Sequence, residues 1–146
     1  MNIKILKETQ DKVVYHISDA ELPLVNALRR LVMEEVPTMA IDEVTFVKNN
    51  SALYDEVISH RMGLLPLTSD LKSYNFQEDC KCNGKGCSRC QVKMTLQAKG
   101  PCTVYASDIK SKDSKIKPIY PETPITLLLK GQDIEIEAVA KLGRGK

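Results

Sequence analysis

The sequence predicts an α+β protein whose sheets are mostly antiparallel. Three observations carry this prediction: a pair of short apolar stretches at the amino end, one long amphipathic helix pattern after them, and a second group of strand-like segments towards the carboxyl end. Residues 92–98 alternate apolar and polar side chains, which is typical of a strand with one buried face. A polar segment containing a cysteine cluster separates the two groups of elements.

The pattern predicts a helix over residues 19–36. Ser18 or Asp19 can cap its amino end, and Pro23 is tolerated in the first turn. Pro37 ends the helix because proline cannot continue it. The apolar residues recur at spacings of three and four, which places them in one stripe: Leu24, Val25, Leu28, Leu31 and Val32.

The remaining elements are predicted to be short. A second helix covers residues 54–61 and ends at Gly63, and residues 108–124 form a surface loop rich in lysine and proline. The last two strands are expected to pair with each other around Gly131 and Gln132. The predicted strands are residues 2–7, 13–17, 39–47, 92–98, 102–106, 125–130 and 133–141.

The cysteine cluster has the spacing C-x-C-x4-C-x2-C and consists of Cys80, Cys82, Cys87 and Cys90. Thiolates in two close pairs can occupy the corners of a tetrahedron around zinc, with Zn–S distances of about 2.3 Å. Glycines between the pairs let the chain turn back on itself. Because four protein ligands leave no coordination position for water, a zinc ion here is expected to be structural.

Two other interpretations of the cluster remain open. The four thiols also suit an iron–sulfur cluster, although the C-x-C start fits the common ferredoxin spacings poorly. Disulfides are the third possibility, and they are disfavoured because the amino end lacks a secretory signal pattern. The fifth cysteine, Cys102, lies in an apolar strand pattern and is expected to be buried.

The sequence shows no catalytic constellation. His16 and His60 have no nucleophile pattern nearby, and phosphate-binding loops, dinucleotide fingerprints and nucleophile elbows are missing. The formal net charge is +2 and the chain has two Phe, five Tyr and no Trp, so composition gives little support for nucleic-acid binding. No apolar run approaches the roughly 20 residues of a membrane span. We therefore expect a non-catalytic cytoplasmic protein.

Two longer motifs, NALRRLVMEEVPTMAIDEV at 26–44 and NNSALYDEVISHRMGLLPL at 49–67, resemble the archaeal D subunits of DNA-directed RNA polymerase. Relatives of that family are the third-largest subunit of eukaryotic polymerase II and the amino-terminal domain of the bacterial α subunit. The form HRMGLLPL, the cysteine loop after it and the stretch AVAKLGRGK at 138–146 resemble the archaeal and eukaryotic branch.

The resemblance implies a dimerisation domain with a β-rich domain inserted into it. Residues 1–46 would be the first segment of the dimerisation domain, and residues 47–146 the inserted domain with a metal loop at 80–90. Family members continue past the motif LGRGK into a further strand and a long helix, so this chain is expected to lack a carboxy-terminal portion. The helix residues that would lie at the assembly interface are Asn26, Leu28, Arg29 and Arg30.

By the same resemblance, the chain would be a non-catalytic assembly subunit of DNA-directed RNA polymerase. Its heterodimer partner would be the small L subunit, and its further partners would be the small N and P subunits and the second-largest subunit. DNA would be reached only through the complex. Two alternatives of other classes are an iron–sulfur redox or sensing protein, and a zinc-ribbon nucleic-acid-binding module that uses Lys110, Lys112, Lys115 and Lys117.

Overall fold

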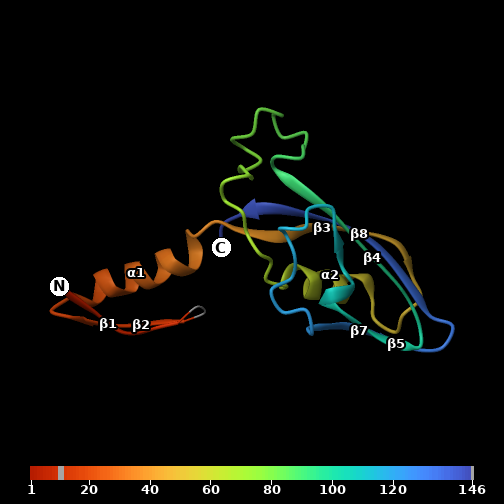
Figure 1. The fold of residues 1–146 in the computed structure, drawn as a ribbon, viewed down its shortest axis with the longest axis horizontal. Coiled ribbons are helices and arrows are strands. Elements are labelled where there is room, and N and C mark those ends of the chain that lie inside the picture. Colours follow the sequence, from red (N-terminus) through yellow and green to blue (C-terminus); the bar gives the residue numbers. More distant parts are fainter. Residues whose placement is uncertain (10–11, 146) are drawn as a thin grey trace. The chain divides into compact units, whose positions relative to one another are not determined.

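The computed structural model describes residues 1–9 and 12–145. Contacts divide the chain into unit 1, Met1–Val36 with Arg144–Lys146, and unit 2, Pro37–Gly143 (Figure 1). The elements in chain order are β1 (Asn2–Glu8), β2 (Val13–Ser18), α1 (Leu22–Glu34), β3 (Thr38–Asn49), α2 (Asp55–Gly63), β4 (Gln91–Lys99), β5 (Cys102–Tyr105), the 3-10 helix η1 (Ala106–Asp108), β6 (Lys110–Ser111), β7 (Pro124–Leu128) and β8 (Asp133–Gly143). The predicted mixture of helices and antiparallel strands is confirmed.

Unit 1 contains the antiparallel hairpin β1–β2 and the helix α1. The predicted helix is confirmed, with Pro23 in its first turn, but the predicted cap is wrong. The helix begins after Glu21 and has no side-chain cap hydrogen bond. Asp19 instead adopts a positive φ of 55°, and its carboxylate accepts a 2.9 Å hydrogen bond from the Asn2 side chain. The Asp19 carboxylate therefore binds the first residue of the β1–β2 hairpin and does not cap the helix.

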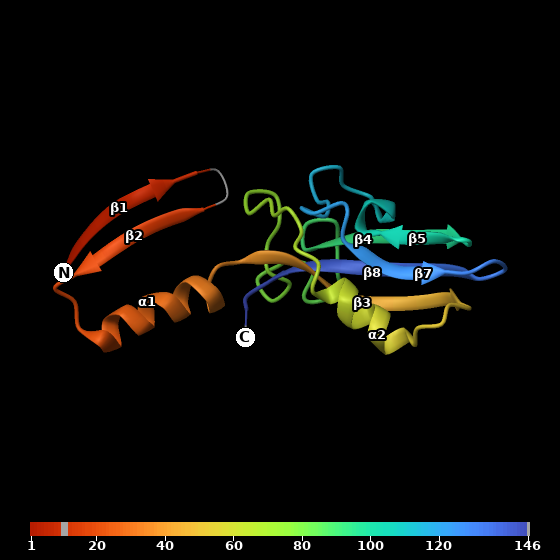
Figure 2. The same ribbon diagram turned by 90° about the horizontal axis from the view of Figure 1, so that it is seen from below.

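Unit 2 is organised around a four-stranded sheet with the order β3–β8–β4–β6. Every strand pair in this sheet is antiparallel, and β8 lies between β3 and β4. Alternate side chains of β8 are buried, as are those of β4, which gives the sheet one apolar face. Helix α2 and the two-stranded sheet β5–β7 cover that face, as Figures 1 and 2 show. The core therefore lies between these two layers.

The predicted pairing of the last two strands is wrong. Strand β7 pairs with β5, whereas β8 pairs with β3 on one side and β4 on the other. Both edges of β8 are thus occupied, so the turn between β7 and β8 connects two sheets instead of closing a hairpin. The Gln132 side chain supports this turn by accepting a 2.7 Å hydrogen bond from the Leu129 amide.

The segment predicted as a lysine-rich surface loop contributes a strand to the four-stranded sheet and two side chains to the core. It contains β6, which pairs with β4, and it places Ile109 and Ile116 in the core. Its lysines are exposed, as expected. No periodic pattern distinguishes the two isoleucines from the polar residues around them, so their burial leaves no signal in the sequence.

The contacts divide the chain between Val36 and Pro37. A boundary after residue 46 falls inside β3, whose pairing with β8 continues to Asn49. Strand β3 therefore lies wholly within unit 2. No helix among residues 1–9 and 12–145 is long and apolar enough to cross a membrane.

Candidate metal centre and assembly helix

The cysteines lie on an irregular segment between α2 and β4, whose base is tied to the segment between β6 and β7. The Thr68 amide donates to the Lys117 carbonyl at 2.9 Å, and the Lys117 amide donates to Thr68 Oγ1 at 2.9 Å. Closer to the cysteines, the Asn75 amide donates to the Arg89 carbonyl at 2.9 Å. These bonds fix both ends of the loop before any metal is considered.

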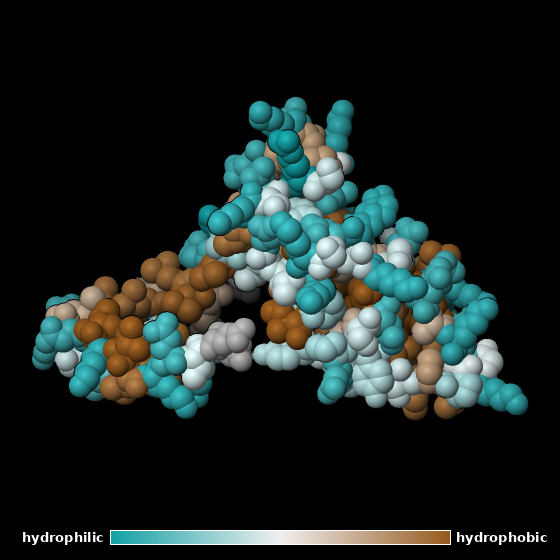
Figure 3. Space-filling model, in the orientation of Figure 1, coloured by the Kyte–Doolittle hydropathy of each residue, from teal (hydrophilic) through white to brown (hydrophobic). Residues whose placement is uncertain are grey.

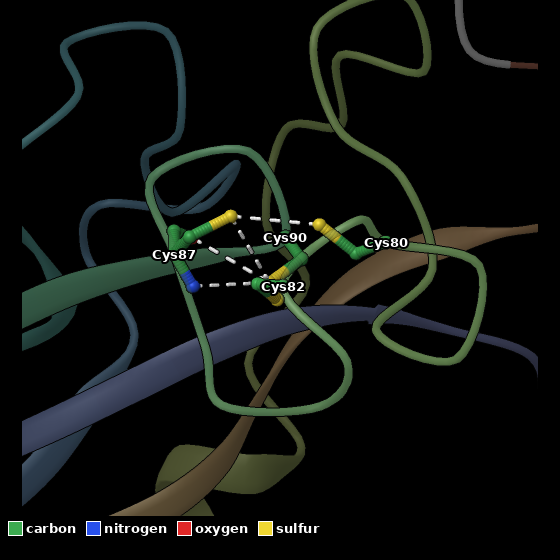
Figure 4. Close-up of side chains that lie close together, drawn as sticks. All are labelled: Cys80, Cys82, Cys87 and Cys90. Carbon is green, nitrogen blue, oxygen red and sulfur yellow. Dashed lines mark hydrogen bonds between the residues drawn. The ribbon is translucent and has the colours of Figure 1, made fainter.

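The four cysteine side chains point towards one another (Figure 4). Sγ of Cys80 lies 3.5 Å from Sγ of Cys87, and Sγ of Cys82 lies 3.7 Å from Sγ of Cys90. All four sulfur atoms lie within 4.8 Å of one another. Cys80 and Cys90 are buried, while the other two are partly exposed. The four residues that the spacing singled out are therefore brought together.

Tight turns bring these sulfurs into place. The Cys90 amide donates to the Cys87 carbonyl at 3.1 Å, and the Cys87 amide donates to Sγ of Cys90 at 3.2 Å. Between the two cysteine pairs, Gly84 and Gly86 have φ values of +80° and +79°, a conformation that strains other residues. Glycine is thus favoured at both positions, and at Gly86 a Cβ atom would also lie 2.4 Å from Oε1 of Gln91.

The thiols differ in acidity. Burial raises the pKa of Cys90 to about 12. Burial also acts to raise the pKa of Cys82, but hydrogen bonds from the Cys80 and Cys90 side chains and from the Gly86 backbone outweigh it, and the pKa falls to about 7. Cys82 is therefore the more acidic of these two thiols, and metal binding to cysteine sulfur releases protons.

The sulfur spacing fits a single tetrahedral ion. Ligands about 2.3 Å from a central zinc lie about 3.8 Å from one another, close to the 3.5–3.8 Å between the sulfurs of Cys80 and Cys87, Cys82 and Cys90, and Cys87 and Cys90. In a [4Fe–4S] cluster each cysteine binds a different iron, and in a [2Fe–2S] cluster two cysteines bind each iron, so sulfur atoms on different irons lie farther apart than ligands of a single ion. The donor set is compatible with one zinc ion.

Cys102 is separate from this site. The prediction that it is buried is wrong, because the side chain is exposed. It occupies the first position of β5, directly after Pro101, where the strand has not yet entered the core. Among the described residues, the four clustered cysteines are the group of histidine, cysteine and acidic side chains that lie close enough to share a metal. His16 and His60 are both exposed.

The predicted interface residues all lie on α1. Asn26, Arg29 and Arg30 are exposed, and Leu28 is half-buried. Arg30 forms a 3.4 Å ion pair with Glu34, but both side chains are largely exposed to solvent. Arg29 Nη1 lies 3.5 Å from the sulfur of Met33. An exposed ion pair such as that of Arg30 and Glu34 contributes little to stability.

Unit 1 exposes most of its apolar side chains. No residue of α1 is buried, and every residue of β1 is exposed. Brown surface is correspondingly extensive over α1 and the β1–β2 hairpin in Figure 3. The large exposed apolar residues of this unit are Met1, Ile3, Ile5, Leu6, Val13, Tyr15, Leu22, Leu24, Leu31, Val32, Met33 and Val36.

A polar network beside the metal loop is not apparent from the sequence. Tyr74 donates a 2.5 Å hydrogen bond to Asp113, and Lys115 forms a 3.1 Å ion pair with Asp70. Ser73 also donates to Asp70, at 2.7 Å. The partners in the first two pairs are far apart in sequence, so no local motif could have revealed them.

Comparison with known proteins places this fold in a family. Residues 40–146 match the family described as RNA polymerase Rpb3/RpoA insert domain. The chain is 40% identical over 149 residues to the DNA-directed RNA polymerase subunit Rpo3 of Methanothermobacter thermautotrophicus, covering 100% of this chain and 56% of that protein.

Two further relatives have the same name and a similar coverage. The Rpo3 protein of Pyrococcus horikoshii is 41% identical over 146 residues, with 100% of this chain and 54% of the relative covered. The Rpo3 protein of Archaeoglobus fulgidus is 40% identical over 144 residues, with 99% and 54% covered. The chain thus spans about half the length of the curated relatives it matches. It belongs to the RNA polymerase Rpb3/RpoA insert-domain family.

Proposed function

We propose that this chain is a non-catalytic assembly element of an archaeal-type DNA-directed RNA polymerase in the cytoplasm. The observation that carries the proposal is the uncovered apolar surface of α1, in a family whose relatives are named as polymerase subunits. A helix with no buried residue is not stabilised by packing within the described residues, and its apolar side suits contact with a further protein surface.

The proposed partners follow from the family resemblance. The small L subunit would pair with unit 1 to form a heterodimer, and the small N and P subunits and the second-largest subunit would complete the assembly. In terms of domains, we propose that the first strands and α1 belong to the dimerisation domain, and that the β-rich remainder with its metal loop is the inserted domain. The exposed Arg29 and Arg30 would set the register with the partner, because guanidinium groups form paired bonds with carboxylates and carbonyls.

Co-purification tests this proposal. Tagged chain expressed with the subunits of an archaeal polymerase should recover a small partner and then the large subunits. The double variant Arg29→Glu/Arg30→Glu should lose them, because it reverses two charges on the exposed side of α1. Unchanged recovery of every subunit by this variant would contradict the assigned interface.

A matched control is available in unit 2. Lys110→Glu/Lys112→Glu also reverses two exposed charges, but in and next to β6. It should leave assembly intact. The same variant tests the nucleic-acid-binding alternative, which requires salt-dependent binding of the isolated wild-type chain to DNA or RNA and its loss in this variant.

We further propose that the four clustered cysteines bind one structural zinc ion. Zinc would supply a tetrahedral crosslink between the two cysteine pairs, with no open position for chemistry. Metal analysis of chain purified without added metal should give one zinc per chain and no visible absorption. A brown protein that contains iron and labile sulfide would instead support the iron–sulfur alternative.

A further inference from the structure

Gln77 lies three residues before the first cysteine and reaches over the metal loop. Its side-chain amide nitrogen donates a 2.7 Å hydrogen bond to the carbonyl oxygen of Gly84. Its own backbone carbonyl accepts a 3.4 Å hydrogen bond from the Cys80 amide. One residue outside the ligand set therefore contacts both the start of the loop and its tip.

The tip is the part of the loop that most needs such support. It lies between the two cysteine pairs, and Gly84 and Gly86 hold it in left-handed conformations that glycine also leaves readily. The backbone hydrogen bonds near the tip each close a single turn, such as the 3.1 Å bond from the Lys85 amide to the Cys82 carbonyl. The tip lies outside every strand and helix of the described chain. An added hydrogen bond at Gly84 thus restricts the turn that sets the separation of the two pairs.

A second glutamine closes the other side of the tip. The side chain of Gln91 packs so tightly against Gly86 that a Cβ atom at that glycine would lie 2.4 Å from Gln91 Oε1. Gln91 belongs to β4 and is thereby fixed to the sheet. The tip is held between a glutamine on the sheet and a glutamine on the incoming segment.

We propose that Gln77 is a positioning residue for the metal loop, because its amide preorganises the Gly84 turn that brings the two cysteine pairs together. The inference rests on the proposed metal site. In such sites, groups that orient the ligands typically change metal affinity by roughly 10–100-fold. Since the Gln77 contact acts on backbone and not directly on a ligand, we expect the lower end of that range.

The test measures zinc release from the full chain into a chromogenic chelator. Gln77→Ala removes the contact, and Gln77→Glu keeps the side-chain shape but removes the amide donor. Both variants should release zinc roughly tenfold faster than wild type. Gln97→Ala is the matched control, because it loses a 2.6 Å glutamine hydrogen bond to Glu135 on the four-stranded sheet, outside the metal loop. It should release zinc at the wild-type rate.

A spectroscopic readout separates positioning from loss of a ligand. Cobalt-substituted Gln77→Ala should retain the absorption of a tetrahedral four-thiolate site while releasing the metal faster. Wild-type release rates in both Gln77 variants would overturn the role of Gln77, as would equal acceleration in Gln97→Ala. If the wild-type chain bound neither zinc nor cobalt, the proposed metal site would be overturned, and the role of Gln77 with it. That result differs from unchanged release rates in the Gln77 variants, which would overturn the role of Gln77 alone.

Discussion

The hydroxyl of Tyr74 donates a 2.5 Å hydrogen bond to Oδ2 of Asp113, joining two segments 39 residues apart in sequence. Tyr74 is buried and lies on the segment that leads into the metal loop. Asp113 lies between β6 and β7, so this bond attaches the base of the loop to the edge of the four-stranded sheet.

Replacing Tyr74 by Phe should destabilise unit 2 by about 1–2 kcal/mol, because a hydrogen bond to a carboxylate is lost while the ring remains packed. Chemical denaturation of both proteins measures the difference. Tyr54→Phe is the control, since Tyr54 is 79% exposed and should change the free energy of unfolding very little. An equal loss in both variants would show that the Tyr74 hydroxyl has no special role.

The same bond predicts an effect at alkaline pH. Burial, aided by the hydrogen bond to Asp113, raises the pKa of Tyr74 to about 12. The folded state thus favours the neutral phenol, so its stabilising contribution is complete below pH 10 and is lost between about pH 10 and pH 12. Thermal unfolding across this range should show a decline that is reduced in Tyr74→Phe. An identical decline in the variant would assign it to other groups.

At acid pH Asp70 is a contributing group, beside Asp113, whose pKa is also lowered by its hydrogen bond from Tyr74. Hydrogen bonds from the Ser73 and Lys115 side chains lower the pKa of Asp70 from 3.8 to about 2. Because the folded state favours the carboxylate, the contribution of Asp70 is present above about pH 4 and is lost as the pH falls towards 2. The melting temperature of wild type should therefore drop over this interval, and Asp70→Asn should show a shallower drop. Parallel curves would rule Asp70 out as a cause.

Sequence patterns predicted the elements better than their partners. Alternation along β4 identified that strand because its buried face imposes a period of two, and the spacing along α1 identified the helix because its apolar side chains form one stripe, although none of them is buried. The pairing of β8 with β3 and β4 could not be predicted, because the choice of neighbouring strands in a sheet depends on packing between segments that are distant in the sequence. The turn at Gly131 suggested a hairpin although each flanking strand has a different neighbour.

In the candidate site, too, local sequence patterns were predictable and contacts between distant segments were not. The clustering of the four cysteines was predicted because metal ligands typically follow one another at short spacings, and the structure brings their sulfur atoms together. Gln77 and Tyr74 carried no comparable signal, since a single polar residue in a polar segment has many ordinary roles. The exposure of Cys102 could not be predicted either, because an apolar local pattern does not show at which residue a strand enters the core.

Thr126 provides a different test of the core. Its side chain is 3% exposed, and its hydroxyl has no hydrogen-bond partner among the described residues. An unsatisfied buried hydroxyl costs free energy, so Thr126→Val should leave stability unchanged or raise it by about 1 kcal/mol. Thr103→Val, on the neighbouring strand β5 and only half-buried, should change it by less than about 0.5 kcal/mol. A clear loss of stability in Thr126→Val would reveal a partner for the hydroxyl.

Removal of one metal ligand should loosen the loop without unfolding the sheet. The core of unit 2 is formed by α2, the four-stranded sheet and β5–β7, and buried Cys90 is not part of its apolar cluster. Cys90→Ser should therefore lose the proposed zinc and increase amide hydrogen exchange across residues 80–90, while β8 keeps its protection. Exposed Cys102→Ser should retain both the metal and the protection. Loss of protection in β8 of the Cys90 variant would mean that the proposed metal stabilises the whole of unit 2.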